Sequence, residues 1–255
     1  MSRLVIRELS GLPEFAAAQA VARQVWGFED LQLPSTSDLQ VVGHVGGMTA
    51  GAFLEGKLVG FVHGLARTNL GKPCHHSHML AVRPKFRGRG VSVRLKFFQR
   101  SWCLARGIRR VTWTYDPLLV LNARLNLVRL RARACTFLPN VYGELGGLYG
   151  GLPTDRFEVH WDLDRPEVQR AARGIAPEPR DAGDLPRASP RHLPAARRVA
   201  MEIPSGAPAL YAADPAAARR ARASLRRTAR ALFDRGYEAV GLVARGETAL
   251  YVFER

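Results

Sequence analysis

The sequence predicts an α/β fold, and three patterns in the first half of the chain carry that prediction. The start, RLVIREL, alternates apolar and polar residues with period two, as a half-buried strand does. Two apolar runs within residues 48–67 meet at Glu55-Gly56, which is a hairpin signal. Between His76 and Leu95 the apolar period changes from that of a strand to that of a helix, with two glycines at the change.

The residues after these two glycines form the clearest helix pattern. Gly107 follows the pattern and is a typical residue just past a helix end. The apolar side chains step by four, three and four residues, which places them on one face of a helix: Val91, Leu95, Phe98 and Trp102.

The other elements of the first 163 residues alternate in the same way. A proline in the first turn favours a helix that starts at residue 13, and apolar runs bounded by turn residues favour strands. In chain order we expect a strand over 3–9, helices over 13–26 and 35–45, two strands within 48–67, a strand over 75–82, a helix over 91–107, a strand over 108–117, a helical run over 118–132, and strands within 136–143 and 156–163.

A change of composition marks a boundary after residue 163. From Asp164 to about Pro194 the chain holds six prolines and many charges with little periodicity, which is typical of a linker. Strand and helix patterns return in ARRVAMEIPS, after Asp214-Pro215, and in YEAVGLVAR and TALYVFER. We therefore expect a main domain, a Pro/Arg-rich linker, and a C-terminal α/β extension that packs on or next to the main sheet, over residues 1–163, 164–195 and 196–255.

The chain is strongly basic, with a formal net charge of +16. Nearly all of this charge is arginine, since the chain has only four lysines. The arginines are spread along the sequence, and the aromatic residues do not interleave with them as a stacking platform would require. Nucleic-acid binding usually combines a basic stripe with stacking aromatics. A solvated basic surface is therefore favoured over a nucleic-acid partner.

The cysteines and the apolar runs bear on the compartment. Cys74, Cys103 and Cys135 are an odd, widely spaced set without a CxxC pair, which favours reduced thiols over a disulfide framework or a zinc site. No apolar run reaches the roughly 18 residues of a membrane span, and MSRLVIRELS lacks the apolar centre of a secretion signal. We expect a cytoplasmic protein without a metal ion and without a membrane partner.

The segment KFRGRGVS between strand and helix has the composition of an anion site. Gly88 and Gly90 let the backbone approach a ligand closely, and the first N–H groups of a helix, with its dipole, attract phosphates. Arg87 and Arg89 can add charge-assisted hydrogen bonds. The segment lacks the Gly-Lys-Ser/Thr of a Walker loop and the GxGxxG of a dinucleotide fold. A surface turn that is merely basic is the alternative.

The run LAVRPKFRGRGVSVRL resembles the pyrophosphate-binding motif, Gln/Arg-x-x-Gly-x-Gly/Ala, of the GNAT superfamily of acyl-CoA-dependent N-acyltransferases. When the motif starts at Lys85, Gly88 and Gly90 fit and lysine replaces Gln/Arg. When it starts at Arg87, Gly90 fits and Ser92 stands where Gly or Ala is usual. The order of the predicted elements also resembles that superfamily, and the run from HSHMLAV to RFEVHWDL is similar to a poorly characterised branch of predicted acetyltransferases.

This resemblance implies a mixed, mostly antiparallel twisted sheet flanked by helices, with acyl-CoA in a V-shaped gap between the fourth and fifth strands. Acetyl-CoA, or another acyl-CoA such as succinyl-CoA, is the implied co-substrate, and no metal is implied. The fourth strand would pair with the pantetheine arm, and the glycine segment would hold the pyrophosphate. The implied binding residues are Ala81, Val82, Arg87, Gly88, Arg89, Gly90, Val91 and Ser92, and Asn122 and Asn126 are candidates either for the cofactor arm or for solvated or capping roles.

Acyl transfer to an amine needs a base for the amine and a group that stabilises or protonates the leaving thiolate. His76 and His78 are the candidates for the base, because histidine titrates near neutral pH. In a strand without a bulge they would share a face with Leu80 and Val82. The alternative is a polar strand start whose imidazoles bond to the backbone.

The acid that the resemblance implies, a tyrosine on the helix after the fifth strand, is absent, and Leu127 stands near that position. Tyr115, Tyr142 and Tyr149 are candidate substitutes, although buried or loop tyrosines are usually structural. The glycine-rich run over residues 143–155 is expected to form a lid on the acceptor side or, alternatively, a plain surface loop.

The function favoured by these residues and by the resemblance is transfer of an acyl group, in the first place acetyl, to the amine of a small molecule such as an amino acid. Two alternatives stay open. One is a non-catalytic GNAT-like module that binds acyl-CoA as a signal or holds a partner, and the other is a basic nucleic-acid-binding protein. The C-terminal extension would shape the acceptor pocket or support a homodimer.

Overall fold

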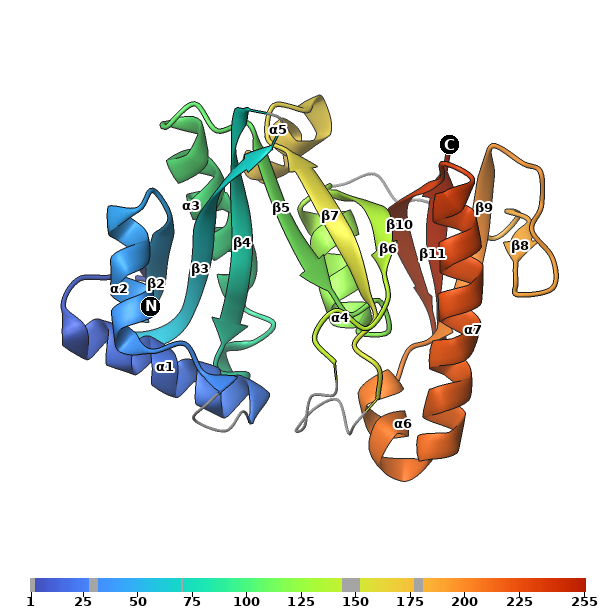
Figure 1. The fold of residues 1–255 in the computed structure, drawn as a ribbon, viewed down its shortest axis with the longest axis horizontal. Coiled ribbons are helices and arrows are strands. Elements are labelled where there is room, and N and C mark those ends of the chain that lie inside the picture. The colour runs from blue at the N-terminus through green and yellow to red at the C-terminus, as the bar shows by residue number, and fades with distance from the viewer. Residues whose placement is uncertain (1–2, 28–31, 70, 144–151, 177–180) are drawn as a thin grey trace. The chain divides into compact units, whose positions relative to one another are not determined.

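The computed structural model describes residues 3–27, 32–69, 71–143, 152–176 and 181–255 (Figure 1). These residues form two compact units. The first consists of Met1–Trp113 with Asp162–Asp164, and the second of Thr114–Trp161 with Arg165–Arg255. The predicted lid over residues 143–155 lies mostly outside the described residues.

The first unit is built on a sheet with the strand order β1-β2-β3-β4-β5. Neighbouring strands are antiparallel, except that β4 and β5 are parallel. Its elements in chain order are β1 (Val5–Glu8), α1 (Leu12–Trp26), α2 (Thr36–His44), β2 (Met48–Leu54), β3 (Lys57–Asn69), β4 (Lys72–Val82), the 3₁₀ turn η2 (Pro84–Phe86), α3 (Val91–Leu104) and β5 (Arg110–Tyr115).

Helices cover both faces of this sheet (Figure 1). α1 and α2 lie on one face, where Phe15, Leu39 and Phe61 are buried in one apolar cluster. α3 lies on the other face and buries Leu95 and Trp102. Helices therefore lie over both faces of the sheet that contains β4, although His78 of β4 stays exposed.

Local sequence sets the ends of the first two helices. Pro13 lies in the first turn of α1, and Gly27 ends it in the left-handed conformation with φ of 65°. Ser35 Oγ accepts a hydrogen bond from the amide of Asp38, whose carboxylate accepts one from the amide of Ser35. This reciprocal capping fixes where α2 begins.

The buried face of α3 differs from the predicted one. Phe98, which the apolar spacing places inward, is only half-buried, whereas Lys96, Gln99 and Cys103 are buried. The helix is therefore rotated so that part of its buried face is polar, and hydrogen bonds to β4 replace apolar contacts there.

The second unit contains a sheet with the strand order β7-β6-β10-β11-β9-β8, antiparallel except between β8 and β9. The helix α7 packs along this sheet (Figure 1). The elements in chain order are α4 (Val120–Ala123), η3 (Arg124–Arg129), β6 (Arg133–Leu138), β7 (Arg156–Asp162), α5 (Pro166–Ala172), β8 (Arg187–Ala188), β9 (Arg198–Pro204), α6 (Ala207–Ala213), α7 (Pro215–Asp234), β10 (Glu238–Arg245) and β11 (Thr248–Glu254).

The helical run predicted over residues 118–132 is confirmed only in part. Four residues form the α-helix α4, and η3 continues it with π-helical hydrogen bonds. The wider π turn brings Asn126 and Leu127 to buried positions. β6 ends at Leu138, directly before Pro139, which lacks the N–H that a continuing ladder needs.

Helix α7 begins where the sequence predicts, with the side chain of Asp214 accepting a hydrogen bond from the amide of Ala217 at 2.8 Å. Its inner face also carries charge. Arg222 donates two hydrogen bonds of 2.8 Å to the carboxylate of Asp116, and both side chains are almost fully buried. This ion pair ties α7 to the residue that follows β5.

The predicted fold class is confirmed: the chain is a mixed α/β protein with a largely antiparallel sheet flanked by helices, followed by a C-terminal α/β segment. The predicted linker over residues 164–195 contains the helix α5 and the short strand β8. The domain boundaries stay a prediction. Within the described residues, no helix is both long and apolar enough to span a membrane.

Candidate active site

The start of α3 has the backbone of an anion-binding site. Gly88 and Gly90 have φ of 76° and 74°, and Gly90 occupies the N-cap position, where no side chain caps the helix. The first hydrogen bond of this turn runs from the amide of Arg94 to the carbonyl of Gly90. The N–H groups of residues 91–93 therefore precede the helical ladder and can bind a ligand.

The side chains around these N–H groups add positive charge. Arg87 Nε donates to the carbonyl of Val82 at 3.3 Å, and Arg89 lies with its guanidinium 5.7 Å from the ring centre of Phe86. A Cβ added at either glycine would meet no atom within 4 Å, so open space adjoins the backbone here. The glycine segment, residues 87–92, has the features that a pyrophosphate group requires, and it is called the cradle below.

The strand before the cradle separates from its neighbour. In the described part of the chain, β4 pairs with β5 at two positions only, His75 with Val111 and His76 with Thr112. From Ser77 to Val82, β4 keeps its pairing with β3 on the other side. Successive residues of a strand direct their N–H and C=O groups to opposite sides, so alternate groups over 77–82 can pair with an extended ligand.

A bulge lies in β4 at the point of separation. His63 of β3 pairs with Met79 and Gly64 pairs with Ser77, so His78 has no opposite residue. The bulge reverses the alternation of the strand. The expectation that His76 and His78 share a face with Leu80 and Val82 was conditional on an unbroken strand and does not hold, because Met79, the residue before Leu80, packs into the cluster under α1.

Three histidines, His63, His76 and His78, have neighbouring rings beside this bulge. The ring of His78 lies 6.2 Å from that of His63 and 6.3 Å from that of His76. His63 is buried and its Nδ1 lies 2.8 Å from Thr49 Oγ1. Desolvation lowers the pKa of His63 to about 4, and partial desolvation also lowers the pKa of His78. Both rings are therefore neutral at pH 7, which a base requires.

The other candidate base is held by a threonine. His76 Nδ1 lies 3.2 Å from Thr112 Oγ1, which also accepts a hydrogen bond of 2.9 Å from Arg67 Nη1. His76 is half-buried, and His78 is the more exposed of the two. Both residues are candidates from the sequence, and the structure places their rings near each other; their role as a base stays a prediction.

Three of the remaining predicted residues, Tyr115, Asn122 and Asn126, lie in the second unit, whereas Tyr149 lies outside the described residues. Tyr115 is buried against Phe157, with ring centres 5.9 Å apart, and burial raises the pKa of its phenol. Asn122 is exposed on α4, and Asn126 is buried within η3. The burial of Tyr115 favours a packing role, and the cofactor contacts of the two asparagines stay predictions.

A buried polar cluster on the α3 side of β4 was missed by sequence reasoning. Lys96 Nζ donates to Ser77 Oγ at 2.9 Å and to Gln99 Oε1 at 2.7 Å, and it lies 3.7 Å from the ring centre of Trp113. The side-chain amide of Gln99 lies 3.0 Å from His75 Nε2. The signal in the sequence was weak, since a lysine beside an apolar helix face is usually exposed.

Two further features lie apart from this site. Within the described residues, no group of three or more His, Cys, Asp or Glu side chains is placed to hold a metal ion.

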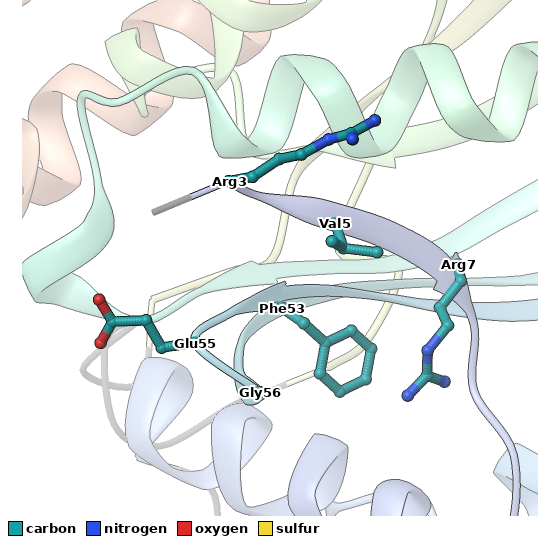
Figure 2. A pocket seen from close by; sticks show the side chains of 6 residues that line it. All are labelled: Arg3, Val5, Arg7, Phe53, Glu55 and Gly56. Atoms are coloured by element: carbon teal, nitrogen blue, oxygen red, sulfur yellow. The ribbon is translucent and has the colours of Figure 1, made fainter. Parts of the chain in front are cut away.

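Figure 2 shows a pocket of about 380 Å³ at β1 and the β2–β3 turn. Its Arg7 stacks on Phe53 and forms an ion pair with Glu14. None of the predicted site residues line it.

Comparison with known proteins bears on the family and the fold. The model of the Acetyltransferase (GNAT) family matches residues 16–122, which include β4, the cradle, α3 and β5. A search among curated proteins found no match. The matched segment, residues 16–122, is therefore similar to the GNAT acetyltransferase family, as the motif and the element order predict.

Solved structures share the fold at low sequence identity. The ribosomal-protein-S18-alanine N-acetyltransferase of Escherichia coli is 15% identical with a TM-score of 0.51, over 64% of this chain and 96% of that one. The ribosomal-protein-alanine N-acetyltransferase of Brucella melitensis is 17% identical with a TM-score of 0.51, over 62% and 99%. A GNAT-family acetyltransferase of Streptococcus pneumoniae is 16% identical with a TM-score of 0.51, over 62% and 98%.

Proposed function

We propose that the protein is an N-acyltransferase that moves an acyl group, in the first place acetyl, from acyl-CoA to the amine of a small molecule by direct transfer. The observation that carries this proposal is the separation of β4 from β5 directly before the cradle. One extended ligand with a phosphate group at one end can use both features. Acyl-CoA is such a ligand, and it supplies the activated thioester.

The length of the cofactor arm fits the length of the free strand edge. About twelve bonds join the pyrophosphate oxygen of CoA to its sulfur, which equals four residues of extended chain, or roughly 13–14 Å. Val82, beside the cradle, lies four positions along β4 from His78, at the bulge. An arm paired along this edge would bring its thioester to the bulge. Ala81 and Val82 would pair with it, and residues 87–92 would hold the pyrophosphate.

The proposed base is a histidine at this bulge. An amine acceptor must lose a proton as it attacks, and a neutral imidazole can accept that proton. His78 lies at the bulge itself. His76 lies two residues before it, and its ring contacts the hydroxyl of Thr112. Either imidazole therefore adjoins the place where the thioester would lie, and single variants separate the two.

An amino acid is the first acceptor class to test. Arg67 and His76 both contact Thr112 Oγ1, so a guanidinium lies beside a candidate base on the same face. A guanidinium binds carboxylates well. An acceptor whose carboxylate met Arg67 would have its α-amine close to His76.

The alternative function is a non-catalytic module that binds acyl-CoA. One observation favours it. Leu127 stands near the position where related enzymes keep the tyrosine that acts as general acid, and Leu127 is fully buried. Binding would then occur without turnover. Many enzymes accelerate transfer mainly by positioning the reactants, so this leucine does not by itself remove activity.

A thiol-release assay tests the proposal. Acetyl-CoA and succinyl-CoA are incubated with a panel of amino acids and matched amines that lack the carboxylate, and free CoA thiol is measured over time. The proposal expects turnover with at least one amine. This turnover should be lost in His76→Ala or in His78→Ala. Arg67→Met should raise KM for an amino acid and leave the carboxylate-free amine unaffected. Binding of acyl-CoA without turnover on any acceptor would favour the non-catalytic module.

A further inference from the structure

The side chain of Lys96 occupies the vertex of the gap between β4 and β5. The last paired residues of the two strands are His76 and Thr112, so Ser77 and Trp113 are the first residues past the pairing. Lys96 Nζ lies 2.9 Å from Ser77 Oγ and 3.7 Å from the ring centre of Trp113. Its ammonium group therefore bridges the two strands at the point where they separate.

Hydrogen bonds and packing fix the ammonium group in this place. Lys96 Nζ donates to Gln99 Oε1 at 2.7 Å, and the amide nitrogen of Gln99 lies 3.0 Å from His75 Nε2, which can accept from it. The chain of donors runs in one direction, from Lys96 through Gln99 to His75. The side chain of Lys96 is only 2% exposed, so it has little freedom to leave the vertex.

The titratable side chains described beside the ammonium are uncharged at neutral pH. On β4, burial and the nearby Lys96 lower the pKa of His75 to about 3, so its ring is neutral. On α3, burial raises the pKa of the Cys103 thiol to about 12, so it stays protonated. Ser77, Gln99 and the aromatic face of Trp113 contribute dipoles only. Desolvation lowers the pKa of Lys96 itself to about 7.

We propose that Lys96 Nζ donates a proton to the sulfur of CoA as the acyl group is transferred. This inference rests on the proposed function, since it requires the thioester to lie at the bulge beside Ser77. The lysine, which lies on α3, would supply the proton that a tyrosine on the helix after the fifth strand supplies in related enzymes.

The proton balance of the step is complete. The amine nitrogen attacks the acyl carbon and loses one proton to a histidine at the bulge, while the bond from the acyl carbon to sulfur breaks. The electron pair of that bond stays on sulfur, which takes a proton from Lys96 Nζ and leaves as the free thiol. A thiol has a pKa of about 8.5, which is higher than the pKa of about 7 of Lys96. Proton transfer from Lys96 to the thiolate is therefore favourable. Water then returns the histidine proton to Lys96.

A bound thiol measures this interaction without any acceptor. A cation within about 4–6 Å lowers the pKa of an anionic group by roughly 1–3 units. The ultraviolet absorbance of the thiolate is followed against pH for bound CoA, with bound desulfo-CoA subtracted to remove the protein signal. We expect the pKa of the bound thiol to be at least about 1 unit lower in the parent than in Lys96→Met. Lys57→Met, an exposed lysine in the β2–β3 hairpin, is the matched control and should equal the parent.

A second measurement uses the parent alone, so that a folding defect in Lys96→Met leaves the test intact. The chain has only four lysines, and labelling each at Cε gives four resonances to follow by NMR. The apparent pKa of Lys96 should rise when CoA binds and should not rise with desulfo-CoA. Two results would overturn the proposal. One is a thiol pKa that is equal in the parent and in Lys96→Met, and the other is an apparent pKa of Lys96 that is the same with CoA and with desulfo-CoA. Absence of any CoA binding by the parent would overturn the proposed function as well.

Discussion

Replacement of Gly90 by alanine separates the backbone strain at this position from its role in the cradle. Gly90 has φ of 74°, where an L side chain costs about 1–2 kcal/mol. Gly107, just past the other end of α3, has φ of 70°, and a Cβ at either position meets no atom within 4 Å. Gly90→Ala and Gly107→Ala should therefore share one backbone cost, and each should lower the melting temperature by roughly 2–8 °C.

Only Gly90→Ala should weaken the binding of CoA. Its Cβ would lie beside the N–H groups at the start of α3 and displace a phosphate oxygen from at least one of them. A hydrogen bond to a charged group contributes about 1.5–3 kcal/mol, so the dissociation constant should rise about 10- to 150-fold. Titration calorimetry measures the affinity, and thermal unfolding measures the strain.

Two results would refute this reasoning. An unchanged affinity in Gly90→Ala, with the expected loss of stability, would show that the phosphates do not use these N–H groups. An equal loss of affinity in Gly107→Ala would show that general strain in α3, and not contact at the cradle, controls binding.

The histidines and glycines of the first unit allow three further tests. Loss of the base in His78→Ala or His76→Ala should lower kcat about 10²- to 10⁴-fold without weakening CoA binding, and equal turnover of both variants and the parent excludes both residues. Gly64→Ala should lower the free energy of unfolding in urea by about 1–3 kcal/mol, because its Cβ would lie 2.2 Å from Nε2 of His75. In the control Gly43→Ala the new Cβ meets nothing within 4 Å, so this variant should be neutral or stabilising. Equal urea midpoints for the two variants would contradict this reasoning. His63 has its pKa lowered to about 4 by burial, so the unfolded chain takes up its proton first, and stability should fall by about 1.4 kcal/mol per unit between pH 6.5 and 4 and then level off. His63→Gln should lose that part of the slope, and identical slopes in parent and variant would contradict the burial of a neutral ring.

The cradle was predictable because its chemistry is local. Two glycines, two arginines and a change of apolar period lie within a few residues of one another, and the structure places Gly88 and Gly90 at positive φ before α3. The capping of α2 by Ser35 and of α7 by Asp214 is local in the same sense. In each case the residues that decide the geometry are close in sequence.

The bulge at His78 was not predictable, because it depends on pairing between two strands. Nothing in HSHMLAV differs from a regular strand, and the extra residue appears only when His63 and Gly64 of β3 are matched to β4. The same limit applies to the ion pair of Asp116 with Arg222, whose partners lie 106 residues apart. Such features arise from tertiary packing, which a periodic pattern does not contain.

The buried Lys96 was missed for a different reason. Pattern reading assigns lysine to the surface, and in most helices that assignment holds. Here Ser77, Gln99 and Trp113 supply partners from three elements, and these partners make burial of the ammonium tolerable. The sequence shows each of these residues but not that they meet.

Titration calorimetry of the parent protein with acetyl-CoA tests the central claim most directly, namely that acyl-CoA binds along the free edge of β4 with its pyrophosphate in the cradle. We predict micromolar binding that Gly90→Ala weakens and Gly107→Ala does not. Absence of heat with acetyl-CoA, succinyl-CoA and free CoA alike would contradict the claim, and the Arg-Gly-Arg-Gly segment would then be only a basic turn between a strand and a helix.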